Sequence, residues 1–370
     1  MKKHVTRSLS LALCVFLICS CALAGQDAPD QNYPRKIIDS AGREVTLHMP
    51  PERIIVLNSD AAEAITMLGA EDKVVGISDT IKNKGYFFPK LKDKQVVGKW
   101  NDPDYEMIGE IAKNGDAIVP DIIVISYSYP DKPYGITGVE NGLSPFGNIT
   151  SIGLDFYKPE NLTEEMEKLG AILGREEEAR DYISWYEEKE ADVEKAVGGS
   201  SMPKVYVEWS AKSNDLSTMG SGTGFNGMLK IARGYNIAKD LSDPYPKVDW
   251  EWVVSESPEI IIKRQTQSSD REEIGWKRGP SQDTVKLEAA INELLSRAAA
   301  KSVPAVKEDK VYAVDWDIMA GLDQIVGLTY LAKMIHPDAD LDPAAVHREY
   351  LQRLGLEYPD ERIFVYPEPG

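Results

Sequence analysis

Cysteine is nearly absent from the chain. The 370 residues include three cysteines, Cys14, Cys19 and Cys21, all close to the amino terminus. The body of the protein therefore has no disulfide, no cysteine nucleophile and no paired C-x-x-C site. Histidine is also rare: one of the four lies in the leader and three lie away from the candidate ligand-binding strand ends, which argues against a histidine-based Zn²⁺ or Ni²⁺ site. Motifs such as G-x-S-x-G and H-E-x-x-H do not occur, so the sequence indicates a binding protein without a cofactor, and not an enzyme.

Basic residues are outnumbered: 42 Lys and Arg stand against 60 Asp and Glu, and the formal net charge is −18. This charge argues against a nucleic-acid partner and against binding of an anionic membrane surface by the folded body. Hydrophobic runs of spanning length are missing after the amino terminus, so we expect the folded part to lie outside the membrane.

The amino terminus is typical of a secretory signal peptide over residues 1–24, because Lys2, Lys3 and Arg7 precede an apolar run from Leu9 to Leu23. Two endings are open. The sequence ICSC ends in Cys21 and approximates a lipobox, whereas ALA at 22–24 offers an ordinary cleavage site. We favour lipidation of Cys21 because a polar, flexible tether over residues 25–34 follows it. The protein is then extracytoplasmic, held at the outer face of the cell membrane, and periplasmic where an outer membrane exists.

A long charged segment, Arg175 to Gly198, has roughly helical apolar spacing and no internal glycine, which predicts a helix. Gly174 separates it from a shorter amphipathic segment that begins at Asn161. Because 370 residues exceed what one core usually serves, we expect two domains. The predicted organisation is a lobe over 35–160, a bridging helical segment over 161–198 and a second lobe over 199–370. A surface helix within one large domain is the alternative.

Both flanking regions alternate short buried strands with helices, which predicts an α/β fold with parallel strands in two Rossmann-like lobes. A repeated unit supports two related lobes. Asp104 to Ile108 reads DYEMI ahead of the strand that begins PDIIVI, and Asp249 to Val253 reads DWEWV ahead of the strand that begins PEIII. The same order of acid, aromatic, glutamate, two apolar residues, helix and buried strand thus occurs once in each lobe.

In open α/β sheets, ligands bind beyond the carboxyl ends of the strands. This rule gives the candidate ligand-binding residues Asn58, Ser59, Trp100, Ser126, Tyr127, Trp209, Arg264 and Trp316. Exposed aromatic rings would provide stacking surface for a bulky organic ligand, and Arg264 could contact an anionic group, as could the preceding Lys263. The alternatives are that each tryptophan covers its own lobe's core and that the cations are solvated. The glycine-rich residues 220–224 are either an anion-binding nest or a plain flexible turn.

The segment from Arg53 to Gly69, RIIVLNSDAAEAITMLG, followed by KVVGIS at 73–78, resembles the opening of substrate-binding proteins of ABC importers for ferric siderophores, haem and cobalamin. The similarity continues through the bridge and the later strands, over nearly the whole mature chain. This resemblance implies two lobes that close slightly around a ligand, because one long rigid helix joins them. The insert from Tyr129 to Asn148 departs from the family pattern.

The resemblance also implies partners. One acidic residue on each lobe engages the permease dimer, which works with its ATPase subunits, and the positions that match are Glu106 and Glu251 of the repeated unit. Ordinary solvated glutamates are the alternative. We expect a monomer that binds an iron(III) chelate, since such ligands are common in the family, with a corrinoid (cobalamin) or haem as the alternative. A ligand sensor without a permease is also open.

Overall fold

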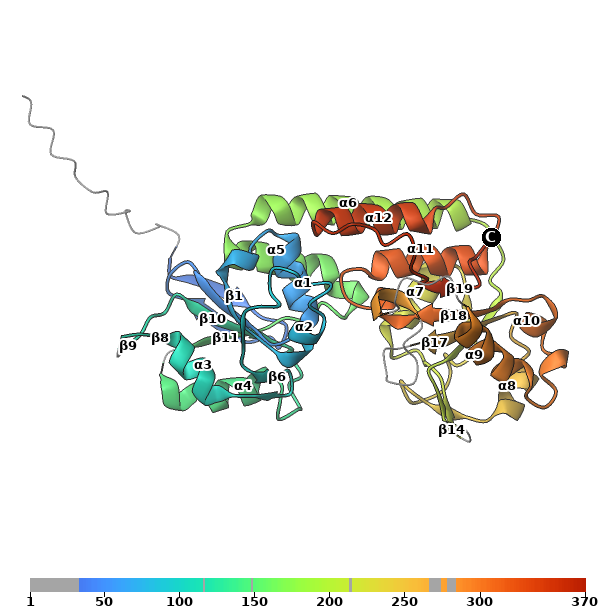
Figure 1. Ribbon diagram of the computed structural model, residues 1–370, viewed down its shortest axis with the longest axis horizontal. Coiled ribbons are helices and arrows are strands. Elements are labelled where there is room, and N and C mark those ends of the chain that lie inside the picture. Colours follow the sequence, from blue (N-terminus) through green and yellow to red (C-terminus); the bar gives the residue numbers. More distant parts are fainter. Residues whose placement is uncertain (1–32, 116, 148, 213–214, 266–273, 278–283) are drawn as a thin grey trace, which may run out of the picture.

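The computed structural model describes residues 33–370 apart from 116, 148, 213–214, 266–273 and 278–283. The described chain forms two α/β lobes beneath one long helix (Figure 1). The leader and its proposed lipidation site Cys21 lie outside the described residues. Among the helices described, none is long and apolar enough to cross a membrane.

The amino-terminal lobe is built on a five-stranded, wholly parallel sheet in the order β11-β10-β3-β4-β5. Its strands are rich in isoleucine and valine and nearly continuous in burial, as expected for a sheet covered on both faces. The strands are β3 (Arg53–Val56), β4 (Val74–Ile77), β5 (Gln95–Val96), β10 (Ile122–Ser126) and β11 (Thr150–Gly153), with a preceding hairpin β1 (Arg35–Ile38) and β2 (Glu44–Leu47). The helices are α1 (Ser59–Met67), α2 (Asp79–Asn83), α3 (Tyr105–Ala112), α4 (Ile136–Leu143) and α5 (Leu162–Leu173).

The carboxyl-terminal lobe has a second five-stranded sheet in the order β15-β12-β17-β18-β19, in which only β19 is antiparallel to its neighbour. The strands are β12 (Lys204–Glu208), β15 (Tyr235–Asn236), β17 (Ile260–Gln265), β18 (Val311–Asp315) and β19 (Val365–Tyr366). A small sheet joins β13 (Ser210–Lys212), β14 (Asp215–Ser217) and β16 (Lys247–Val248). The helices are α7 (Gly224–Ile231), α8 (Trp250–Glu256), α9 (Val285–Leu295), α10 (Pro304–Lys307), α11 (Gln324–Ile335) and α12 (Pro343–Arg353).

The two sheets share one connectivity, which gives the sequence repeat a structural counterpart. When the edge strands β5 and β19 are left out, β3, β4, β10 and β11 lie in chain order as second, first, third and fourth across their sheet, and β12, β15, β17 and β18 lie the same way across theirs. The repeated unit itself forms α3 and α8, each capped by an aspartate: Asp104 accepts from the backbone N–H of Met107, and Asp249 accepts from that of Trp252. The lobes are therefore two copies of one architecture.

Helix α6 (Glu176–Val197) runs along one side of both lobes (Figure 1). Its 22 residues span roughly 33 Å at 1.5 Å per residue. Gly174, with a φ of 67°, ends α5 in the left-handed conformation and allows the chain to turn into α6. The buried face of α6 packs on α5 in one lobe and on α11 in the other, so the expectation of two lobes joined by one long helix is confirmed.

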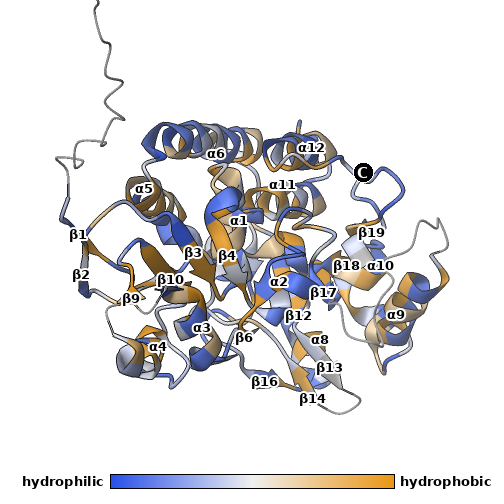
Figure 2. Ribbon diagram, turned by 60° about the vertical axis from the view of Figure 1, so that its left-hand side comes forward, coloured by the Kyte–Doolittle hydropathy of each residue, from blue (hydrophilic) through white to orange (hydrophobic). Residues whose placement is uncertain are grey.

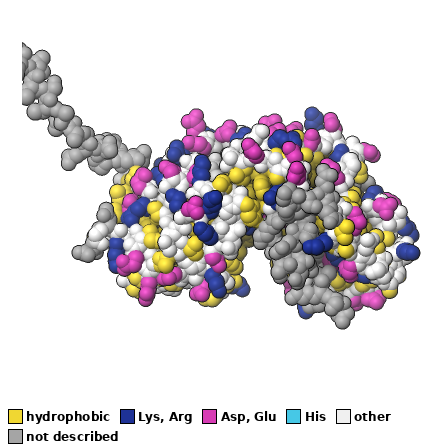
Figure 3. All heavy atoms as spheres, in the orientation of Figure 1, with side chains coloured by type: hydrophobic (Ala, Val, Ile, Leu, Met, Phe, Trp, Pro, Cys, Tyr) yellow, Lys and Arg dark blue, Asp and Glu magenta, His cyan; other side chains and the backbone are white. Residues whose placement is uncertain are grey.

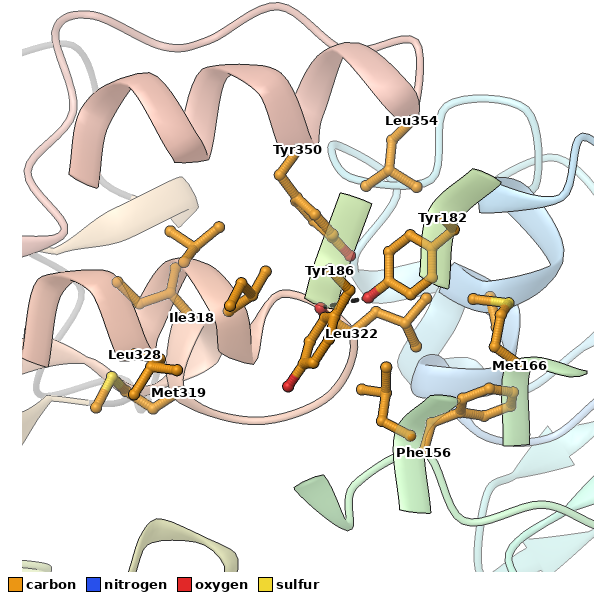
Figure 4. Packing of buried hydrophobic residues seen from close by; sticks show 14 of the residues in the cluster. Phe156, Met166, Tyr182, Tyr186, Ile318, Met319, Leu322, Leu328, Tyr350 and Leu354 are labelled. Atoms are coloured by element: carbon orange, nitrogen blue, oxygen red, sulfur yellow. Dashed lines mark hydrogen bonds between the residues drawn. The ribbon is translucent and has the colours of Figure 1, made fainter. Parts of the chain in front are cut away.

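Aromatic residues on α6 fasten it to the carboxyl-terminal lobe. The hydroxyl of Tyr182 donates to the carbonyl of Leu322 at 2.9 Å, and the rings of Tyr182, Tyr186 and Tyr350 lie close together (Figure 4). Trp185 donates from its indole N–H to Glu349 on α12 at 3.0 Å. Helix α12 thus lies beside α6, an arrangement that the sequence did not predict.

The insert after β10 is part of the fold. Its helix α4 is the crossover between β10 and β11 and packs beside α3. The ribbon of β10 is largely hydrophobic, while that of α6 is largely hydrophilic (Figure 2). Since the crossovers run on both faces of each sheet, the carboxyl ends of the strands are left for loops, and those loops carry the candidate site.

Candidate ligand-binding site

The carboxyl ends of the two sheets face each other between the lobes. Ser59 and Asp60, after β3, line the same small cavity as Asp317, which follows β18. On the side opposite α6 the lobes are separated by a notch (Figure 3). Strand-end side chains from both lobes are therefore brought to one interlobe region, as the rule for open α/β sheets predicts.

One wall of this region is a group of aromatic rings from the amino-terminal lobe. Tyr127 is at its centre, with ring centroids 5.9 Å from Trp100, 4.8 Å from Tyr129 and 5.7 Å from Tyr157. Trp100 also meets Tyr134, 5.3 Å away. Edge-to-face and tilted contacts of this kind are the favoured geometries for aromatic pairs. The group, Trp100, Tyr127, Tyr129, Tyr134 and Tyr157, is called the tyrosine wall below.

Hydrogen bonds hold the tyrosine wall in place. The hydroxyl of Tyr127 donates to Asp60 Oδ2 at 3.0 Å. Burial and the neighbouring Asp60 raise the pKa of Tyr127 well above its usual value, so its phenol stays a neutral donor. Asp155, fully buried after β11, accepts the backbone N–H of Ser128 at 2.9 Å and the ammonium of Lys158 at 2.7 Å. This carboxylate ties the loop that carries Tyr127 and Tyr129 to the loop that carries Tyr157.

The facing wall belongs to the carboxyl-terminal lobe and is centred on Trp209. The guanidinium carbon of Arg264 lies 3.6 Å from the centroid of the Trp209 ring. The Trp209 ring meets Tyr245 at 5.2 Å and Trp316 at 5.2 Å. Trp316 packs in turn on Phe225 of α7. Trp209, Tyr245, Trp316 and Arg264 are called the tryptophan wall below.

The predicted ligand-binding residues therefore divide into two groups. Ser59, Trp100 and Tyr127 lie at or beside the tyrosine wall, and Trp209, Arg264 and Trp316 form the tryptophan wall, although Trp316 is 7% exposed. Asn58 and Ser126 are each 1% exposed, because they end buried strands. Asn58 accepts the backbone N–H of Ala61 at 2.7 Å and so caps α1.

Two further strand-end features have structural roles. Lys263 is 7% exposed and pairs with Glu208 at 2.6 Å and with Glu293 at 2.8 Å, which places it in a buried ionic network. Within the glycine-rich loop, a Cβ on Gly224 would lie 2.6 Å from Cδ of Pro159 in the other lobe. The glycine there permits close approach of the lobes, so a flexible anion nest is not needed to explain it.

Sequence reasoning missed Tyr129, Tyr134, Tyr157 and Tyr245. The signal for three of them was present, since tyrosines recur just after the β10 and β11 strand ends, at positions 129, 134 and 157. Tyr245 gave no such signal, because it precedes β16 and does not follow the carboxyl end of a strand of the main sheet. Among the described residues, no group of three or more His, Cys, Asp and Glu side chains is arranged to hold a metal ion.

The proposed permease-contacting residues, Glu106 and Glu251, are both exposed. Each is the second residue of its helix, α3 and α8, after an aspartate cap. Figure 1 shows these helices on the side away from α6, one in each lobe. The geometry thus presents one carboxylate from each lobe at equivalent positions.

Two α/β lobes that join through one long helix and face each other across aromatic walls define a binding protein of the periplasmic type. The chain belongs to the family described as "Periplasmic binding protein", whose sequence profile matches residues 54–317. This confirms the resemblance recognised in the sequence.

Individual relatives support the same family. The chain is 24% identical over 273 residues to the "Cobalamin-binding protein" of Halobacterium salinarum, covering 70% of this chain and 69% of the relative. It is 24% identical over 316 residues to the "Uncharacterized ABC transporter substrate-binding lipoprotein YvrC" of Bacillus subtilis, covering 83% and 87%. In structure it is similar to the TroA-like periplasmic binding protein FepB of Veillonella parvula, with a TM-score of 0.71, 20% identity and coverage of 90% and 99%.

Proposed function

We propose that the chain is the extracytoplasmic substrate-binding protein of an ABC importer and that it captures a corrinoid between the tyrosine and tryptophan walls. The observation that carries the proposal is the chemistry of these walls. Each lobe contributes large aromatic rings near the carboxyl groups of the interlobe cavity, and two of the neighbouring lysines are paired with acids. Lys158 pairs with Asp155 and Lys84 with Asp317.

This arrangement favours a bulky, weakly charged ligand. Stacking on aromatic rings and burial of apolar area suit a macrocycle with a large face and amide edges. A polyanionic chelate would meet the carboxylates of Asp60 and Asp317, and like charges brought together in a poorly solvated site cost free energy. The cobalamin-binding relative from Halobacterium salinarum supports the same ligand class.

An iron(III) chelate of low charge is the second candidate. Arg264 favours it, because the positive charge of its guanidinium beside Trp209 attracts the oxygens of a chelate. A neutral ferric trihydroxamate fits this chemistry better than a ferric catecholate with several negative charges. Haem is a further candidate, because tyrosine can bind haem iron and the tyrosine wall supplies four tyrosines. Burial raises the pKa of Tyr127, Tyr129 and Tyr157, which disfavours the phenolate that such a bond needs.

The proposal is tested by titrating the chain from Gln26 onward with cyanocobalamin, a ferric trihydroxamate, a ferric tricatecholate and haemin, by isothermal titration calorimetry and tryptophan fluorescence. We expect saturable 1:1 binding of cyanocobalamin at sub-micromolar concentration. Tight binding of the trihydroxamate alone would support the second candidate. Binding of the tricatecholate in preference to both would contradict the charge argument.

The membrane attachment is a proposal of its own. The relative from Bacillus subtilis is named a lipoprotein, which supports lipidation of Cys21 in this chain. In a Cys21→Ser variant, the protein should move from the membrane fraction to the soluble extracytoplasmic fraction, whereas Cys19→Ser should leave it membrane-bound. Cleavage after Ala24 predicts instead that both variants stay soluble, like the wild type.

A further inference from the structure

A cavity of about 40 Å³ lies at the seam between the lobes and is lined by residues of both. Asp60 and Glu63 reach it from α1, and Lys84 follows α2, all in the amino-terminal lobe. Asp317 and Asp323 reach it from the loop between β18 and α11 in the other lobe. This volume has room for a water molecule or two and not for an organic ligand. The cavity adjoins the tyrosine wall, because Asp60, which lines it, accepts the hydrogen bond of the Tyr127 hydroxyl.

The charges around this cavity do not balance if every group is ionised. Among the described residues that line it, four carboxyl groups face one ammonium, that of Lys84. Lys84 Nζ lies 3.4 Å from Asp317 Oδ2, and this ion pair joins the two lobes. Glu63 and Asp323 are each 7% exposed, so water screens them poorly. Buried like charges of this kind are relieved when one group keeps a proton.

The hydrogen bonds around the cavity show which of these carboxyl oxygens have a partner and which have none. Glu63 accepts from the hydroxyl of Tyr350 on α12. Asp323 Oδ1 is buried and has no hydrogen-bond partner among the described residues. A carboxyl oxygen in that position is stable when it shares a proton or a water with a neighbour. The other titratable groups facing the pair are Asp60, Lys84, Asp315, Asp317, Tyr182 and Tyr350.

We propose that the seam cavity is a proton-binding site, in which Glu63 and Asp323 share a proton, and that loss of this proton separates the lobes. The proton removes one negative charge from a cluster that includes carboxyl groups of both lobes. Without it, Glu63 on α1 repels Asp317 and Asp323 across the seam, and Lys84 alone cannot neutralise them. Closure of the lobes is then linked to pH, whatever ligand the walls bind.

The direction in which pH changes the stability of the closed protein follows from the pKa values of Glu63 and Asp323. Burial raises the pKa of Glu63 from 4.5 to about 8, and it raises that of Asp323 well above its usual value. Between pH 4.5 and about pH 8, Glu63 holds a proton in the folded protein that it has already lost in the unfolded chain. The contribution of Glu63 to stability is therefore fully present below about pH 4.5 and is lost as the pH rises towards 8.

The test measures the distance between the lobes as a function of pH. The chain from Gln26 onward has no cysteine, so spin labels can be attached at Glu110→Cys on α3 and Ser255→Cys on α8, both exposed. We expect the label-to-label distance, measured without ligand by pulsed electron paramagnetic resonance, to lengthen or broaden between pH 6 and 9.5. In Glu63→Gln, which cannot lose a proton, the distance should stay at its low-pH value.

Two further variants test the assignment. Tyr350→Phe removes a donor that favours the ionised form of Glu63, so its transition should move to higher pH; a merely structural role for Tyr350 would not shift the midpoint in this direction. Glu190→Gln on α6 is the matched control, because burial also raises the pKa of Glu190 but it does not line the cavity. It should follow the wild type.

Each outcome decides the proposal. A pH-dependent distance that Glu63→Gln or Asp323→Asn abolishes supports it. A wild-type distance that is constant from pH 6 to 9.5 overturns it, as does a transition that persists in both of these variants. If either isosteric variant fails to fold, the wild-type profile and the midpoint of Tyr350→Phe still decide the result.

Discussion

The guanidinium carbon of Arg264 lies over the indole of Trp209, 3.6 Å from the ring centroid, although 55 positions of sequence separate the two residues. Trp209 directly follows β12, and Arg264 lies in β17, the neighbouring strand. A cation held this way gains roughly 0.5–2 kcal/mol from the ring. The pair therefore offers a ligand an aromatic surface that carries a positive charge.

Replacing the ring should weaken ligand binding. In Trp209→Ala we expect the dissociation constant for the bound ligand to rise at least about tenfold, which corresponds to about 1.4 kcal/mol, because stacking area and the support of Arg264 are both lost. Calorimetric titration measures the change. Trp250→Phe on α8, outside both walls, should bind within twofold of the wild type. Equal affinities of Trp209→Ala and the wild type would remove Trp209 from the site.

Charge reversal on α3 and α8 should separate binding from transport. The double variant Glu106→Lys, Glu251→Lys is expected to bind ligand as the wild type does, since both residues are exposed and lie outside the walls. Uptake into cells or vesicles should fall more than tenfold, because each lobe then presents the wrong charge to its permease subunit.

Glu110→Lys is the control for this experiment. It changes the same charge on α3 one turn further along, at another exposed position. Its uptake should stay close to that of the wild type. If the double variant transports normally, these glutamates do not contact a permease, and a sensor without transport becomes the better function.

Local sequence signals predicted the framework well. Gly174 separates α5 from α6 as expected, and the repeated unit forms α3 and α8 with aspartate caps, because these features depend on neighbouring residues alone. The strand-end rule also placed Trp100, Tyr127 and Trp209 on the walls. Helix capping, glycine conformation and strand burial depend on residues that are close together in the sequence. A single sequence is therefore enough to predict them.

Contacts between distant segments could not be predicted in this way. Glu63 and Tyr350 are 287 positions apart and meet at the seam, yet neither stands in a pattern that marks a partner. The packing of α12 beside α6 through Trp185 and Glu349 is of the same kind. The sequence identified Lys263 only as a cation at a strand end, because its two acidic partners lie on other elements. Such pairings are set by tertiary packing, which amphipathic periodicity does not specify.

Gly174 should be sensitive to substitution for reasons of backbone conformation alone. A Cβ there meets nothing within 4 Å, but φ is +67°, which costs an alanine about 1 kcal/mol. Urea unfolding of Gly174→Ala should show this loss. Gly227→Ala on α7 also has open space and lacks a positive φ, so it should gain about 0.5–1 kcal/mol from helix propensity. Equal effects of the two substitutions would contradict the conformational explanation.

His347 should make the protein sensitive to acid. The imidazole is 1% exposed, its ring lies 4.5 Å from that of Phe364, and its Nδ1 has no hydrogen-bond partner among the described residues. Burial lowers its pKa from 6.5 to about 3. Between these values the unfolded chain binds a proton that the folded protein does not. Its contribution to stability is therefore present above about pH 6.5 and is lost as the pH falls towards 3.

The size of this effect can be isolated with His347→Phe, which keeps an aromatic ring of similar shape in the cluster. From pH 7 to pH 5, protonation of the unfolded chain at this residue costs the wild type about 2 kcal/mol of unfolding free energy. Other groups titrate in both proteins, and the opposite contribution of Glu63 cancels in the comparison. The difference between wild type and variant in urea unfolding should therefore change by about 2 kcal/mol across this range. His48→Asn, at an exposed position, should follow the wild type, and a variant that remained as acid-sensitive as the wild type would mean that His347 does not carry the effect.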